Sequence, residues 1–235
     1  MTSYAESIAT EGYAVIPSQI LRGHLDVEVL LPVVEEWEEL PCDEYVPEGG
    51  SYRFRRYGRL LALPDDRVGY TLKPLPVAAF RQAAAVIPLY QGQERNFASI
   101  SESILAAPVL QELIKYDLGI VFEVEGHRRP YCIGLHMIRV VATSTKQGFP
   151  APEGRHSDGH SYVAMHLIGR KSCTGGSSRV YLGKSSVPAL VTTMQEFMDT
   201  IIIDDRRVEH EVTPVQAIGE TGIRDTLLVD FDPEP

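Results

Sequence analysis

The amino-acid sequence predicts a mainly β fold, an antiparallel barrel or jelly roll with flanking helices from its N-terminal half. Three observations predict this class. The chain has 235 residues, 44% hydrophobic and 23% charged, which is the balance of a globular protein with a sizeable core. After about Leu118, short runs of β-branched and aromatic residues alternate with clusters of Gly, Pro, Asp and Ser. No long helical pattern separates these runs, which argues against a βαβ architecture.

The first elements are expected to be two helices and one short strand. The S-x-x-E pattern at residues 3–6 is a capping box and Gly12 is placed as a C-terminal stop, so a helix of about two turns is expected there. Residues 12–17 (GYAVIP) are typical of a short strand. Apolar residues recur at helical spacing over 25–40, where Trp37 is expected to anchor the core.

Two further helices are predicted before the β-rich half. Residues 76–87 and 101–116 have a helical pattern of apolar residues. Pro108 is expected to split or restart the second helix, because proline interrupts the helical hydrogen bonds unless it lies in the first turn.

Residues 52–59 hold four arginines interleaved with aromatic residues, which is unusual in an acidic chain. Strand alternation places Arg53, Arg55 and Tyr57 on one face. Two interpretations stay open: a pocket wall that holds a substrate carboxylate, or a solvated edge strand.

The second half supplies seven predicted strands, and the TGGSS segment at 174–178 is expected to be a hairpin turn between two of them. We expect a single domain over residues 1–235, in which the helix-rich residues 1–118 pack on the core strands of 119–235. The predicted strands are 119–126, 131–143, 161–170, 178–183, 200–204, 207–214 and 226–231.

The composition of the chain limits the classes of partner that we expect. With 22 basic against 32 acidic residues, the formal net charge is −10, so nucleic acid and anionic membranes are not expected partners. A small-molecule substrate is favoured, and a homo-oligomer stays possible. No apolar run approaches a membrane span and the N-terminus lacks the pattern of a secretion signal, so a cytoplasmic location is expected. The three cysteines are expected to be reduced.

The most informative stretch contains His156 and Asp158. Side chains two apart in a strand share a face, so this pair can offer one imidazole and one carboxylate to a single metal ion. A second imidazole from His210, on a later predicted strand, would complete the two-histidine, one-carboxylate triad that leaves three positions of Fe(II) open.

Arg224 and Thr226 open the last predicted strand on one face. An arginine that enters a barrel there is suited to bind a dicarboxylate, because its planar fork pairs both oxygens of a carboxylate. The alternative is a surface cation paired with Asp225 or Asp230.

The segment PAPEGRHSDGHSYVAMHLIGRKSCTGG resembles the signature of bacterial Fe(II)/2-oxoglutarate dioxygenases that include L-isoleucine hydroxylases and related free-amino-acid hydroxylases. DDRRVEHEVTP and GIRDTLLVDF are similar to the distal-histidine and closing-arginine blocks of that family. The resemblance implies a double-stranded β-helix, a cupin-like jelly roll. It also implies Fe(II) on His156, Asp158 and His210, O2 as co-reactant, and 2-oxoglutarate on Arg224.

The resemblance extends with decreasing strength over about residues 50–232, through SYRFRRYGRL, YQGQERN and LHMIRV. Thr226 and His136 are further candidates to bind 2-oxoglutarate. Ser172 stands where the family usually has Asn, so the substrate identity is not transferred. The candidate substrate residues are Arg55, Tyr57, Tyr90, Gln91, His160 and Ser172.

The sequence therefore predicts hydroxylation of an unactivated C–H bond in a free amino acid or a similar small molecule, with release of succinate and CO2. Desaturation or ring closure by the same iron chemistry stays open. So do a non-oxidative metal cupin, such as an isomerase or hydrolase, and a non-catalytic jelly roll that binds a small molecule.

Overall fold

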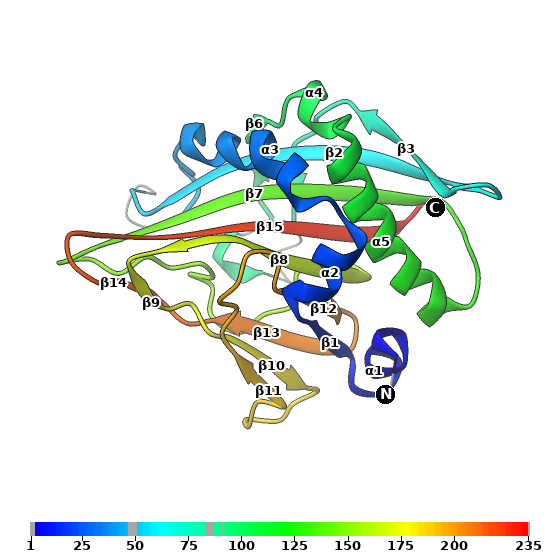
Figure 1. Cartoon of the computed structure of the whole chain (residues 1–235). Coiled ribbons are helices and arrows are strands. Elements are labelled where there is room, and N and C mark those ends of the chain that lie inside the picture. Colours follow the sequence, from blue (N-terminus) through cyan, green and yellow to red (C-terminus); the bar gives the residue numbers. More distant parts are fainter. Residues whose placement is uncertain (1–2, 47–50, 83–86, 91, 235) are drawn as a thin grey trace.

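The computed structural model describes residues 3–46, 51–82, 87–90 and 92–234. In this portion of the chain, an eight-stranded sheet has the order β1–β12–β8–β15–β7–β2–β3, with β6 beside β2 (Figure 1). All its pairings are antiparallel except β2 with β6. Its strands are β1 (Tyr13–Ile16), β2 (Arg53–Asp65), β3 (Gly69–Leu75), β6 (Ala98–Ser99), β7 (Tyr131–Thr143), β8 (Tyr162–Lys171), β12 (Thr200–Asp204) and β15 (Thr221–Pro233).

A three-stranded sheet with the order β11–β10–β13 lies against the large sheet (Figure 1). Buried apolar side chains from both sheets, among them Met165, Val180, Ile201 and Val208, form one cluster between them. The predicted mainly β, antiparallel class is thus confirmed. The remaining strands are β10 (Ser178–Leu182), β11 (Leu190–Thr192) and β13 (Val208–Val212), the pair β9 (Cys173–Gly175) and β14 (Val215–Ala217), and the pair β4 (Phe80–Arg81) and β5 (Glu94–Arg95).

Helices pack on the other face of the large sheet (Figure 1). Leu135 and Leu227 of the sheet share the main hydrophobic cluster with Leu113 and Ile114 of the longest helix, α5. No helix in the described residues is both long and apolar enough to cross a membrane. The helices are α1 (Tyr4–Glu11), α2 (Ser18–His24), α3 (Leu31–Glu35), α4 (Glu102–Leu105) and α5 (Pro108–Glu125), with 3-10 turns at Val27–Leu30, Glu36–Glu39 and Pro88–Tyr90.

Local signals at the N-terminus are confirmed. The Ser3 side chain accepts a hydrogen bond from the Glu6 backbone N–H at 3.0 Å, and Gly12 ends α1 with a φ of 81°. Trp37 is buried in the core, and its indole N–H donates to the Ile138 carbonyl. The helical pattern of 25–40 is divided between α3 and two 3-10 turns rather than forming one helix.

The predicted strand at 119–126 is wrong, because α5 continues to Glu125. Ile114, Leu118 and Val121 are all buried and follow helical spacing, so one face of a single helix buries them together. The β-branched residues of this segment suggested a strand, whereas burial of the apolar face of α5 in the core stabilises a helix there.

The structure differs from three other predictions made from the sequence. The predicted helix at 76–87 is contradicted at Phe80–Arg81, which form β4, and residues 83–86 lie outside the described residues. Residues 53–62 pair with β7, so β2 is not a solvated edge strand. Residues 174–178 are not a simple hairpin, because β9 pairs with β14 while β10 belongs to the three-stranded sheet.

Candidate active site

A cavity of about 80 Å³ is lined by both sheets. Alternate residues of β2, β7 and β15 face it, because side chains two apart in a strand point to the same side. The other face of these strands carries the apolar side chains that meet the helices. The cavity is lined by Arg53, Arg55, Phe80, Gln82, Tyr90, Arg95, His136, Ile138, Pro150, Ala151, Glu153, His156, Asp158, His160, Met165, His210, Val212, Arg224, Thr226 and Leu228.

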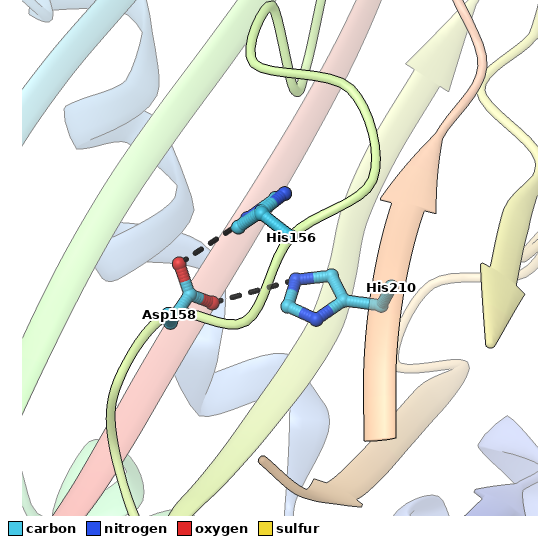
Figure 2. A group of neighbouring side chains, drawn as sticks. All are labelled: His156, Asp158 and His210. Carbon is cyan, nitrogen blue, oxygen red and sulfur yellow. Dashed lines mark ion pairs between the residues drawn. The ribbon is translucent and has the colours of Figure 1, made fainter. Parts of the chain in front are cut away.

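His156, Asp158 and His210 meet in this cavity (Figure 2). The Nε2 atoms of His156 and His210 lie 3.4 Å from Asp158 Oδ1 and Oδ2, respectively. The two histidines come together because their backbones exchange hydrogen bonds of 2.9 and 2.7 Å. The strand expected around His156 is reduced to this single bridge with β13. The structure thus brings all three predicted residues together.

The three side chains are oriented as a metal centre needs. His156 Nδ1 lies 2.8 Å from the Gly154 carbonyl and donates to it, so its Nε2 lone pair points toward Asp158. Asp158 Oδ2 is buried and has no hydrogen-bond partner among the described residues. Although burial opposes ionisation, the two imidazoles that face the carboxylate hold the pKa of Asp158 well below its usual value. Two imidazoles and one ionised carboxylate are a donor set suited to Fe(II).

Asp205, which the sequence analysis missed, holds the segment that carries Asp158. Its carboxylate accepts backbone N–H bonds from Asp158, Gly159 and His160, at 3.1, 2.7 and 3.0 Å, and a hydroxyl bond from Ser157. Its side chain is fully buried and its Oδ1 lies 3.8 Å from His210 Nδ1. Asp205 therefore connects the two segments of the chain that supply the triad.

Arg224 is buried and lines the same cavity. Burial and the neighbouring Arg170 lower its pKa to about 10, and its Nε has no hydrogen-bond partner in the described structure. The alternative of a surface pair with Asp225 or Asp230 is wrong, since Arg139 holds Asp225 and His136 holds Asp230. A buried guanidinium without a carboxylate partner suits an anionic ligand.

Thr226 lies two residues from Arg224 on the same strand and also lines the cavity, as the sequence predicted. His136 lines it too, but both of its ring nitrogens are engaged within the protein, with Arg55 and with Asp230. It therefore has no free N–H for 2-oxoglutarate, and the predicted cofactor contact is not supported.

The arginine-rich strand forms one wall of the cavity. Arg53 is buried in an ion pair with Asp43 at 2.8 Å and also donates to the Tyr90 hydroxyl. Arg55 is buried beside it, and the described structure gives it no carboxylate within ion-pair distance. Arg95, which the sequence analysis did not single out, packs its guanidinium 3.7 Å from the centre of the Tyr90 ring. Arg53 and Arg55 thus lie in a pocket wall, and the binding of a substrate carboxylate there stays a prediction.

The other candidate substrate residues are dispersed. Tyr57 stacks on His136 and faces an adjoining cavity of about 260 Å³. His160 lies between the two cavities and bonds Asp232 through Nδ1 at 2.6 Å. Ser172 is exposed in a turn and is not among the residues that line either cavity, so its predicted substrate contact is not supported. Gln91 lies outside the described residues.

Sequence signals existed for some of the missed residues. Glu153 belongs to the PEG motif that ends two residues before His156, and its buried Oε2 has no hydrogen-bond partner in the described structure. Asp205 precedes His210 in the DDRRVEH block, at the end of an apolar strand. Arg95 gave no spacing signal, because the chain around it forms no long regular element.

Comparisons with known proteins agree with this geometry. Residues 34–230 match a family model described as 2OG-Fe dioxygenase. The chain is 26% identical over 246 residues to 3(1)-hydroxy-L-isoleucine 4-dioxygenase of Pantoea ananatis (strain AJ13355), covering 98% of this chain and 96% of that protein. It is 28% identical over 143 residues to L-isoleucine-4-hydroxylase of Bacillus thuringiensis, covering 60% and 59%.

Solved structures give the same fold. A bsmA homolog from Methylobium petroleophilum PM1 superposes with a TM-score of 0.85 at 25% identity, covering 98% of this chain and 92% of that one. IDO from Bacillus thuringiensis superposes with a TM-score of 0.80 at 22% identity, covering 99% and 95%. The predicted jelly-roll class is confirmed, and the family match over most of the chain makes it an oxidoreductase. The chain belongs to the 2OG-Fe dioxygenase family.

Proposed function

We propose that this protein is an Fe(II)- and 2-oxoglutarate-dependent oxygenase that hydroxylates a C–H bond of a free amino acid or a similar small molecule. One observation carries the proposal. The His156–Asp158–His210 cluster shares a cavity with Arg224, a buried cation without a carboxylate partner in the described structure. A metal triad beside a free guanidinium is what an iron enzyme with a dicarboxylate cosubstrate requires.

His156, Asp158 and His210 would hold Fe(II), because their donor atoms all lie within 4.8 Å of one another. Arg224, with Thr226 beside it, would hold the far carboxylate of 2-oxoglutarate. The bound iron and cosubstrate supply the oxidising power with O2, and 2-oxoglutarate leaves as succinate and CO2. The chain would contribute the orientation of both reactants in the cavity.

The proposed substrate class rests on the wall of the cavity that β2 forms. Arg55 is buried there without an ion-pair partner in the described structure, and it would bind the carboxylate of the substrate. Tyr90 and Arg95 would flank that group, since both line the same wall. The names of the Pantoea and Bacillus relatives support an amino acid as substrate, because both act on isoleucine or a hydroxylated isoleucine.

We further propose that residues 1–235 form one catalytic domain that works in the cytoplasm on small molecules, without a nucleic-acid or membrane partner. The net charge of −10 supports the absence of a nucleic-acid partner. A homo-oligomer stays open.

The test is an assay with Fe(II), ascorbate, 2-oxoglutarate and a panel of free amino acids, in which succinate and substrate mass are measured. We expect substrate-stimulated succinate and a product that gains one oxygen atom. A product that loses two hydrogen atoms would instead identify desaturation or ring closure. His156→Ala should bind no Fe(II) tightly, and Arg224→Met should raise the KM for 2-oxoglutarate. Wild-type protein that binds Fe(II) but forms no succinate with any substrate would contradict the oxygenase proposal and favour a non-oxidative metal cupin.

A further inference from the structure

Three buried side chains form a continuous hydrogen-bonded chain along the wall of the candidate active site. Arg55 of β2 donates from its guanidinium to His136 Nδ1 on β7. His136 Nε2 lies 2.8 Å from Asp230 Oδ2 on β15. The exposed fractions of the three residues are 7%, 1% and 4%. The imidazole is also fixed on its faces and edge, since Tyr57 stacks on it at 4.6 Å and the Phe80 ring meets it at 4.9 Å.

The partners of His136 determine its tautomer. A guanidinium can only donate hydrogen bonds and an ionised carboxylate can only accept them. Nδ1 must therefore carry the lone pair toward Arg55, and Nε2 must carry the proton toward Asp230. Burial and the nearby Arg55 lower the pKa of His136 to about 4, which keeps the ring neutral at physiological pH.

Asp230 is itself held in place by the neighbouring strand. Its Oδ1 accepts the backbone N–H of Gly134 at 2.9 Å, across the β7–β15 ladder in which these two residues are partners. A Cβ at position 134 would collide with the Asp230 carboxylate, so only glycine leaves room for this contact. The carboxylate is thus fixed from one side and orients the imidazole from the other.

Arg55 is the end of this chain that can donate hydrogen bonds into the cavity. Its guanidinium packs 4.3 Å from the centre of the Phe97 ring, and its buried Nε has no hydrogen-bond partner in the described structure. In the described structure, the Nε–H donor of Arg55 is therefore left for an anion. We propose that His136 and Asp230 are positioning residues that hold the Arg55 guanidinium ready for the carboxylate of the substrate. This inference rests on the proposed function for the identity of that anion.

The first test reads the tautomer directly and needs no activity. In Asp230→Asn, the amide oxygen still accepts the hydrogen bond from the Gly134 N–H, so the amide NH2 faces His136 Nε2. Because that NH2 is a donor, the ring proton moves to Nδ1, where it faces the N–H donors of Arg55. Nitrogen NMR of histidine-labelled protein should find an Nε2–H tautomer at His136 in the wild type and an Nδ1–H tautomer in the variant. An Nδ1–H tautomer in the wild type would overturn the proposal.

The second test is kinetic. Asp230→Asn should raise the KM for the amino acid about tenfold, the loss expected for one hydrogen bond to a charged group, with little change in kcat or in the KM for 2-oxoglutarate. His136→Phe should act in the same way. His136→Asn, whose amide oxygen can accept from Arg55, should recover some of the loss. With an amino-acid amide as substrate, the difference between Asp230→Asn and wild type should disappear.

Asp117→Asn is the matched control. Asp117 and His166 form another fully buried Asp–His pair, 3.0 Å apart, but neither lines the cavity. This variant should leave both KM values unchanged, whatever its effect on thermal stability. Equal effects of Asp230→Asn on the two KM values, or on acid and amide substrates, would overturn the positioning role. A protein that turns over no amino acid contradicts the proposed function instead, and the NMR test then still decides whether Asp230 orients His136.

Discussion

Gly176 lies directly against the side chain of Arg224. A Cβ at position 176 would come within 2.8 Å of Arg224 Cδ and 3.1 Å of its Nε. The glycine has a φ of 65°, in the segment that leads from β9 to β10. This segment, which leads from the β9–β14 pair to the three-stranded sheet, therefore covers the buried guanidinium closely, and a glycine is required for that approach.

Gly176→Ala should accordingly displace the Arg224 side chain and raise the KM for 2-oxoglutarate about tenfold, because a misplaced guanidinium loses its paired hydrogen bonds to a carboxylate. Initial rates at varied 2-oxoglutarate measure this. Gly183→Ala is the control, since Gly183 also has a positive φ, of 52°, but no neighbour within 4 Å of the added Cβ. Similar KM values in the two variants would mean that backbone strain, not contact with Arg224, is responsible.

Asp205→Asn should weaken Fe(II) binding by about tenfold or more, because the carboxylate orients the segment that carries Asp158. Loss of a residue that hydrogen-bonds to a metal ligand typically lowers metal affinity by about that factor. Anaerobic Fe(II) titration measures the affinity. Asp204→Asn is a close control: Asp204 is also buried, but it pairs with Arg206 and makes no hydrogen bond to residues 157–160. Equal affinities in the two variants would contradict the role of Asp205.

Asp43→Asn should lower the free energy of unfolding by about 3 kcal/mol, because it leaves the buried Arg53 without its counter-ion. Side-chain exposure in this pair is 3% and 0%. Denaturant unfolding measures the change. Glu112→Gln, which removes the exposed pair with Lys115, should change stability by less than about 1 kcal/mol. A loss no larger than that in Asp43→Asn would show that Arg53 finds another partner.

Stability should rise with pH between about pH 4 and 6.5 because of His136. Burial and Arg55 lower its folded-state pKa from 6.5 to about 4, so the unfolded chain binds the proton more readily in this window. Up to about 3 kcal/mol of unfolding free energy is then lost as the pH falls through it. Denaturant unfolding at several pH values measures this. His136→Phe should have a flatter profile, and an unchanged slope would contradict the assignment.

Gly119→Ala should stabilise the protein by about 0.5–1 kcal/mol, because alanine costs less backbone entropy than glycine inside a helix. Gly119 lies within α5 and nothing stands within 4 Å of an added Cβ. Thermal unfolding measures the shift. A destabilised variant would mean that the helix packs more tightly at this point than its surroundings indicate.

The sequence predicted the antiparallel β class and the candidate donor residues of the site, and six of the seven strands that it predicted in the second half of the chain are observed. These features depend on local signals: strand residues bounded by turn residues, the His156-x-Asp158 spacing, and the arginine that opens β15. The incorrect strand prediction at residues 119–126 also came from a local signal. The composition of residues 119–126 favoured a strand, but the buried face of α5 continues through them.

The sequence alone did not predict which partners the individual charged residues would bind. Arg55 and His136 face one another because β2 and β7 pair in a register that places His136 opposite Tyr57. Asp230 reaches His136 because β15 pairs on the other side of β7. A hydrogen bond between residues distant in the chain depends on strand order and register, which no local pattern encodes.

By itself, then, the sequence determined which residue types the protein offers for metal and anion binding, since chemistry and short spacing are properties of the chain. Only the tertiary structure decided that His210 meets His156, that Arg224 is buried without a carboxylate partner in the described residues, and that Ser172 lies outside the cavity. The physical reason is that the burial of a side chain and its distance from others are set only when the two sheets pack face to face, which fixes side chains from separate strands around one cavity.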